Sequence, residues 1–280
     1  MKLKTGQKCA FGYGAFGKDI VYMLIASYLL YYYNVVLGMS SVFIGTVMMA
    51  ARIFDAFNDQ AMTVVVSIIL VYTSINICGN LVLYFFRFDV GNEGAYSIFA
   101  AVAFAAQVLV MMVIPLLRKK FSKSCLFISG FIIQIVGFAV ILIMAFAKLY
   151  TPQSWYILCM PGILIYLGYG MLNVIMTIFL SDSVDYGEVM NGTREESVIF
   201  SMQTFTVKLA SGVAVFLAGL IVDWIHLDTS ATVQTQDTLD ALRMWMTIPS
   251  VILLIVGIFV FKRFYKLDDA RMEEIKSKLN

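Results

Sequence analysis

Long runs of apolar residues, separated by short polar segments, dominate this chain and restrict what it can fold into. Of its 280 residues, 61% are hydrophobic and 14% are charged, a composition too apolar for a soluble domain. Most runs approach the roughly 20 residues that a helix needs to cross a bilayer. The runs cover residues 20–37, 41–57, 61–86, 95–117, 125–147, 155–181, 198–222 and 244–261. The sequence therefore predicts an all-α, multi-pass integral membrane protein with about eight transmembrane helices.

The positive charges predict how these helices are oriented. If the N-terminus is cytoplasmic, fifteen Lys and Arg residues lie on the cytoplasmic side, and only Arg87, Lys148 and Arg243 lie outside. This is the asymmetry expected of cytoplasmic loops. The segment 182–196, expected to be a cytoplasmic loop, is mostly acidic, but acidic residues contribute little to orientation. We expect a protein of a bacterial-type cytoplasmic (inner) membrane with both termini cytoplasmic and a solvated tail at 262–280.

The second and third apolar runs meet at residues 57–60 with almost no loop between them. A single helix over 42–86 would be about 67 Å long at 1.5 Å per residue, more than twice the roughly 30 Å of hydrocarbon in a bilayer. The chain must therefore reverse near Asn58, and the run before this reversal looks truncated.

Arg52, Asp55 and Asp59 are charged residues within strongly apolar sequence. Each costs roughly 2.5–3.5 kcal/mol against insertion at the centre of a membrane, so such residues mark functional sites by default. Asp55 and Asp59 share one helix face, and paired carboxylates suit a small, hard cation. The alternative is that Arg52 neutralises one carboxylate as a packing device. Lys208, central in its apolar run, either pairs with Asp55 or Asp59 or loses its charge, because burial disfavours the charged form.

Several segments closely resemble a known transporter family. Near the N-terminus they are Gly12-Tyr-Gly-Ala-Phe-Gly-Lys18-Asp19, the aromatic run Tyr31-Tyr-Tyr33, and Ala51-Arg-Ile-Phe-Asp55-Ala-Phe-Asn58-Asp59. They resemble the start of the melibiose carrier branch of the glycoside-pentoside-hexuronide:cation symporters, within the major facilitator superfamily. Further along, residues 84–92 resemble the end of the seventh helix of that family, 182–188 its loop between helices ten and eleven, and 194–208 its eleventh helix.

The resemblance implies a shortened member of this family. Residues 1–59 look like helices one and two, residues 60–261 like the six-helix C-terminal half, and 262–280 like the cytoplasmic tail, so that helices three to six are missing. The family carries an Asn-Asp pair in helix two and often another just before helix seven. A deletion between the two would leave the single pair Asn58-Asp59, and whether Asp59 belongs to the old helix two or to the old loop before helix seven stays open.

The resemblance also implies the roles of individual residues. Asp19, with Lys18 beside it, matches an aspartate that accepts hydrogen bonds from sugar hydroxyls. The alternative is an interfacial ion pair at the start of a helix. Asp55, Asn58 and Asp59 match the family's site for Na⁺, Li⁺ or H⁺, which the family completes with a helix-four residue that this chain lacks. Arg52 and Lys208 would be the charge partners of this site.

These features predict a secondary active transporter of the sugar (glycoside):cation symport type, internally truncated, with Na⁺ (or H⁺ or Li⁺) as its coupling ion and no other cofactor. Asp55 and Asp59 would be the ligands of Na⁺. The expected partners are a sugar or glycoside, the lipid bilayer and further copies of the chain that rebuild the missing half, but no nucleic acid. No phosphate-binding loop or Ser/His/Asp set indicates an enzyme. The alternative is a non-transporting remnant or membrane interaction protein derived from such a symporter.

Overall fold

The computed structural model describes residues 60–191, 196–228, 231, 233–265, 272–273 and 275. The chain divides into two compact units, residues 1–57 and 58–280, and all the described residues belong to the second. Two of the predicted spans, 20–37 and 41–57, lie outside the described residues, as do the predicted site residues Lys18, Asp19, Arg52, Asp55, Asn58 and Asp59.

Within its described part, the second unit is all-helical and contains six helices long and apolar enough to cross a membrane. They are α3 (Gln60–Tyr84), α4 (Ala95–Leu117), α5 (Lys123–Phe146), α6 (Cys159–Asn191), α7 (Glu196–Trp224) and α8 (Gln236–Phe264). A π-helical turn, η2 (Phe85–Val90), continues α3, and a 3-10 turn, η3 (Trp155–Leu158), precedes α6. Six of the eight predicted spans are therefore present as helices.

Two helix boundaries differ from the sequence-based expectation. α6 continues to Asn191 instead of ending near residue 181, so the first part of the expected loop 182–196 is helical. Asp182 is buried there and forms an ion pair with Lys123, and this tertiary contact holds a polar segment in the helix. α8 begins at Gln236 instead of 244, because the hydroxyl of Thr235 caps it by accepting a hydrogen bond from the Thr238 backbone N–H at 3.2 Å.

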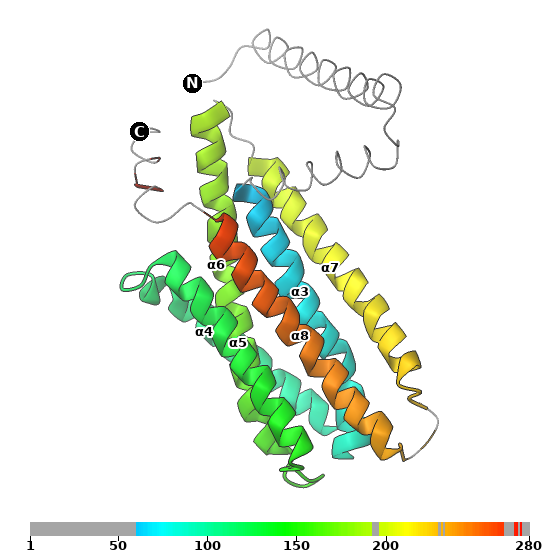
Figure 1. Ribbon diagram of the computed structural model, residues 1–280. Coiled ribbons are helices and arrows are strands. Elements are labelled where there is room, and N and C mark those ends of the chain that lie inside the picture. The colour runs from blue at the N-terminus through cyan, green and yellow to red at the C-terminus, as the bar shows by residue number, and fades with distance from the viewer. Residues whose placement is uncertain are drawn as a thin grey trace, which may run out of the picture. The chain divides into compact units, whose positions relative to one another are not determined.

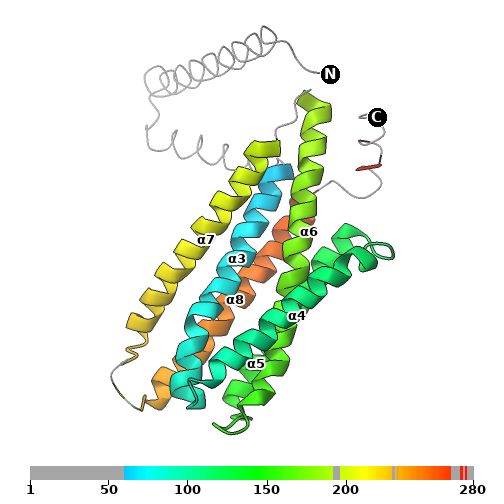
Figure 2. The same cartoon turned by 180° about the vertical axis from the view of Figure 1, so that it is seen from behind.

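The six helices form two layers (Figures 1 and 2). α7, α3, α6 and α4 lie side by side in that order, and α5 and α8 cover the back of this row. α3 is central, because it packs against α6, α7 and α8, whereas α4 packs mainly on α6 and α7 mainly on α3. The two outer helices of the row therefore expose large apolar side chains, among them Phe104, Leu109 and Met112 of α4 and Phe205, Phe216 and Leu220 of α7.

Glycines let α5 and α6 cross closely. A Cβ atom on Gly168 of α6 would lie 2.6 Å from the carbonyl oxygen of Gly130 on α5, and one on Gly137 would lie 2.7 Å from the Ile165 side chain. Small residues at such crossings allow two helix backbones to approach and gain van der Waals contact, which is the main attraction between helices in lipid. The back layer is thus fixed firmly to α6.

Different polar groups lie at the two ends of the unit. At one end, the Lys123–Asp182 ion pair joins the start of α5 to α6. The end of α8 lies at the same end, because the ring centroids of Phe127 on α5 and Phe261 on α8 are 4.4 Å apart. At the opposite end, Arg243 of α8 binds Asp89 of η2. Among the described residues, the charges expected on the cytoplasmic side and those expected outside thus lie at opposite ends. Which end faces the cytoplasm stays a prediction.

Candidate functional site

Polar side chains follow one face of α3 through its apolar sequence. Tyr72, Asn76 and Asn80 are spaced four residues apart, so they lie on one side of the helix, and all three are half-buried. Asn76 Nδ2 donates to the backbone oxygen of Tyr72, and Asn80 Nδ2 donates to that of Asn76, each at 2.7 Å. Ser74, on the opposite side of α3, exchanges hydrogen bonds with Ser250 of α8. The side of α3 that carries Tyr72 and the two asparagines therefore faces away from the back layer.

The neighbouring face of α6 continues this polar surface. Tyr166, Tyr169, Asn173 and Thr177 recur at spacings of three and four residues, so they share one side of the helix. Asn173 Nδ2 donates to the Tyr72 hydroxyl oxygen at 2.7 Å. The rings of Tyr72 and Tyr169 meet edge to face, with their centroids 5.6 Å apart. These contacts join α3 and α6 into one polar and aromatic surface.

α7 adds amide, hydroxyl and ammonium groups beside this surface. Gln203 Nε2 donates to Thr177 Oγ1 of α6 at 3.3 Å. Thr204, the next residue, and Lys208 are exposed on a single flank of α7, four residues apart. A shallow groove at this place is lined by Phe200, Ser201, Thr204, Phe205 and Lys208.

We call this surface the polar face, and it is defined by Tyr72, Asn76, Asn80, Tyr166, Tyr169, Asn173, Thr177, Gln203, Thr204 and Lys208. Lys208 is its single charged group. Phenol, hydroxyl and amide groups both donate and accept hydrogen bonds, and tyrosine rings add flat apolar surface. Together they can bind a neutral ligand rich in hydroxyl groups. The described residues contain no group of three or more His, Cys, Asp or Glu side chains able to hold a metal ion, so they offer no such cluster for a coupling cation.

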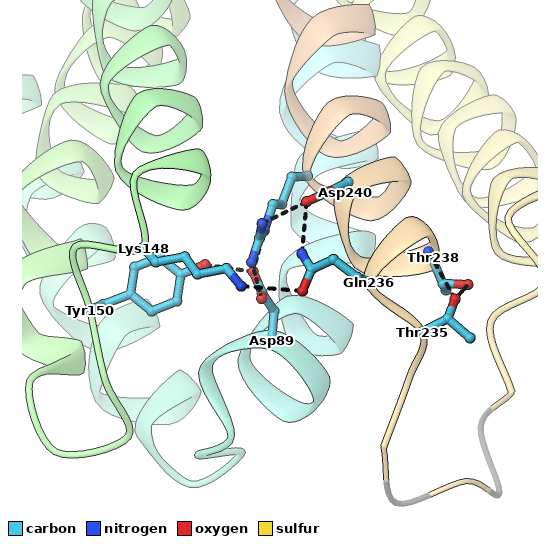
Figure 3. A network of polar contacts seen from close by, with 8 residues as sticks. Asp89, Lys148, Tyr150, Thr235, Gln236, Thr238 and Asp240 are labelled. Carbon is cyan, nitrogen blue, oxygen red and sulfur yellow. Dashed lines mark hydrogen bonds and ion pairs between the residues drawn. The ribbon is translucent and has the colours of Figure 1, made fainter.

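A second polar cluster closes the opposite end of the unit from Lys123 (Figure 3). Arg243 Nε and Nη2 donate to the two carboxylate oxygens of Asp89 at 2.8 and 2.5 Å, and Arg243 Nη1 donates to Asp240 at 2.7 Å. Tyr150, in the connection between α5 and η3, donates its hydroxyl to Asp89 at 2.5 Å. The side chains of Arg243 and Asp89 are 3% and 2% exposed. The cluster therefore ties η2, α8 and the α5–η3 connection together around one buried, bidentate ion pair.

Tyr150 is held in its protonated form by this environment. Burial raises the pKa of its phenol above the ordinary value near 10, and the hydrogen bond that it donates to Asp89 raises that pKa further. The phenol therefore serves as a hydrogen-bond donor throughout the neutral range.

The structure describes only one of the predicted site residues, Lys208, and places it exposed on the flank of α7. Its predicted partners, Asp55 and Asp59, lie outside the described residues, so their pairing stays a prediction. The structure adds residues that sequence reasoning missed. The spacing of Tyr72, Asn76 and Asn80 was a usable signal, since three polar groups repeat at helical spacing within an apolar run. Asp89 and Arg243 had no such signal, because they are 154 positions apart.

Six helices long and apolar enough to cross a membrane, with a polar face on one side of the row, define a polytopic membrane protein. The chain belongs to the family described as "MFS/sugar transport protein", which it matches in two segments, residues 10–67 and 58–269. The two matched segments overlap at residues 58–67.

The chain is also similar in sequence to individual curated proteins. The chain is 25% identical over 223 residues to "Uncharacterized symporter YjmB" of Bacillus subtilis, covering 80% of this chain and 47% of that protein. It is 24% identical over 232 residues to "Raffinose carrier protein" of Pediococcus pentosaceus, covering 81% and 35%. It is 28% identical over 201 residues to "Uncharacterized 29.9 kDa protein in crtE 3'region" of Pseudescherichia vulneris, covering 69% of this chain and 68% of that protein. The chain thus spans less than half the length of the first two of these relatives.

Proposed function

We propose that this protein is an internally shortened member of the sugar:cation symport type, in which the six-helix unit presents its polar face to a sugar or glycoside. The observation that carries the proposal is the polar face itself, with hydroxyl, phenol and amide groups on α3, α6 and α7 inside membrane-length helices. Such groups are costly in lipid unless they bind a partner. A neutral polyol is the ligand that matches their chemistry.

Coupling to a cation would rest on the residues that the sequence singles out in the first unit. Asp55, Asn58 and Asp59 supply the carboxylate and amide oxygens that suit Na⁺, and Asp19 with Lys18 supplies polar contacts to the sugar. Symport follows when sugar and cation each strengthen the binding of the other. Lys208 and Arg52 are the cations available to balance these carboxylates.

The double family match favours a second candidate, a non-transporting remnant or membrane interaction protein. Two segments of the family that meet and overlap at residues 58–67 are what an internal deletion would leave. Alternating access moves one helical bundle against another around a central site, and two N-terminal helices are a small counterpart for six. We therefore expect the isolated chain to bind sugar without accumulating it, unless further copies rebuild the missing half.

Binding by the polar face is tested first with purified full-length protein and calorimetry on a panel of galactosides. We expect Asn76→Ala to weaken binding of any sugar that binds the parent protein by about tenfold, the effect of losing one good hydrogen bond. The matched control is Ser129→Ala, because Ser129 lies on α5 in the back layer and its hydroxyl bonds to its own helix. Equal sugar affinities of the two variants would contradict sugar binding by the polar face.

The first unit is tested by the same measurement with and without Na⁺. Asp19→Asn should abolish sugar binding and leave cation binding largely intact, whereas Asp55→Cys should abolish the effect of the cation on sugar binding. The two carboxylates would then belong to separate subsites joined by a coupling free energy. Sugar binding that survives Asp19→Asn unchanged would contradict this assignment.

Transport separates the two candidates. The full chain is reconstituted alone into vesicles, and uptake of a labelled galactoside is followed under an inward Na⁺ or H⁺ gradient. No accumulation, with binding preserved, supports the non-transporting protein. Accumulation that disappears with Asp19→Asn establishes the symporter.

A further inference from the structure

The turn between α4 and α5 concentrates positive charge around a built cavity. Residues 118–123 read Arg-Lys-Lys-Phe-Ser-Lys, and backbone hydrogen bonds back to α4, such as Lys120 N–H to Leu117 at 3.0 Å, hold the turn in shape. The hydroxyl of Ser122 caps α5 by accepting from the Cys125 backbone N–H at 3.2 Å. A cavity beside this turn is lined by Arg118, Lys119, Lys120, Phe121, Ser122, Lys123, Met272 and Glu273.

Packed side chains form the walls of this cavity. Lys123 and Asp182 form a buried ion pair whose side chains are each 4% exposed, so the charge of Lys123 is balanced within the protein. On the other wall, Met272 is buried beside Ile275 against Tyr186, Val189 and Tyr265. Glu273 is the single carboxylate among the described residues of the lining. Lys119 and Lys120 are exposed at the rim, and among the described residues no carboxylate forms an ion pair with either.

An apolar track on α4 leads to these two lysines. Val108, Met112 and Leu116 are spaced four residues apart, so they share one side of the helix, and all three are exposed. Phe121, in the turn itself, is 48% exposed. This track offers an acyl chain a path along α4 that ends where the positive charge begins.

We propose that this cavity binds the headgroup of an anionic phospholipid. The phosphodiester lies against Lys119 and Lys120, and an acyl chain follows Val108, Met112 and Leu116. Charge complementarity selects an anion, and the apolar track selects a lipid over a free phosphate ion. Basic pockets at the edge of a membrane helix bundle attract anionic headgroups in this manner. The proposal does not depend on sugar transport.

The test uses purified full-length protein in zwitterionic phosphatidylcholine nanodiscs, with increasing fractions of phosphatidylglycerol. Lipids retained by the protein are counted by native mass spectrometry, and thermal unfolding is followed in parallel. We expect the parent protein to retain phosphatidylglycerol preferentially and to unfold at a higher temperature with it. The double variant Lys119→Gln/Lys120→Gln should lose about thirtyfold in affinity, because two ammonium groups no longer lie against the phosphodiester.

The matched control is Lys262→Gln/Arg263→Gln, which removes two exposed cations in the last turn of α8, at the same end of the unit but outside the cavity lining. This variant should keep the affinity of the parent protein. An equal loss in both double variants would show general attraction to an anionic surface and overturn the site. Equal stabilisation by inorganic phosphate would assign the cavity to a free anion and overturn the lipid.

Discussion

At the scale of single residues, the stability of the polar cluster in Figure 3 depends on the pairing of Asp89 with Arg243. Both side chains are almost fully buried and form two parallel hydrogen bonds. Removing one partner from such a pair leaves an uncompensated buried charge, which costs far more than the pair itself contributes.

We therefore expect Arg243→Met to destabilise the six-helix unit by about 3–5 kcal/mol, measured as a fall in the thermal unfolding temperature in detergent. The double variant Asp89→Leu/Arg243→Met should recover most of this loss, since it leaves no fully buried charge behind, and Asp240, the other partner of Arg243, is 38% exposed. Lys148→Gln is the control, because Lys148 makes one exposed hydrogen bond to Gln236 and should change stability by less than about 1 kcal/mol. A double variant as unstable as the single one would contradict this account.

Tyr150 makes the same cluster sensitive to high pH. Its folded-state pKa is raised, first by burial and then by Asp89, so the hydrogen bond contributes fully below the unfolded-state pKa near 10. Above that pH the unfolded chain releases the phenolic proton while the folded protein keeps it, and stability falls. Tyr150→Phe should be less stable than the parent at pH 8, by about 1–3 kcal/mol, and the difference should shrink as pH rises beyond 10. Denaturation measured at pH 8, 9.5 and 11 checks this, and a constant difference would refute it.

At the scale of helices, the close crossing of α5 and α6 depends on the absence of side chains. The Cβ atom of Gly168→Ala would meet backbone atoms, the Gly130 oxygen at 2.6 Å and the Gln134 nitrogen at 2.7 Å, and a backbone cannot move aside as a flexible side chain can. We expect this variant to lose about 1–3 kcal/mol. The control is Gly212→Ala on α7, which has no heavy atom within 4 Å of the new Cβ and should be neutral or stabilising, because alanine favours a helix by up to about 1 kcal/mol over glycine. Thermal unfolding of the two variants compares them, and a loss at Gly212 as large as that at Gly168 would contradict the crossing.

At the scale of the whole molecule, the separation of charged groups to opposite ends predicts the topology. Arg118 to Lys123 and the end of α8 share one end, and the positive-inside rule assigns that end to the cytoplasm. Reporter fusions at Lys120 and at the C-terminus should both report a cytoplasmic location, and a fusion in the 228–235 connection should report the opposite side. A Lys120 reporter outside the cytoplasm would reverse the predicted orientation.

Six transmembrane helices could be located from the sequence alone, because a lipid solvent demands about 20 consecutive apolar residues and an internally bonded backbone. The spacing of Tyr72, Asn76 and Asn80 likewise indicates a polar side of α3, since helical geometry alone brings these residues to one side. Which helix this side would face depended on packing. The bond from Asn173 to Tyr72, the Asp89–Arg243 pair and the Lys123–Asp182 pair in the extended part of α6 all join positions distant in sequence. Local patterns do not encode such contacts, because they form only when separate helices pack together.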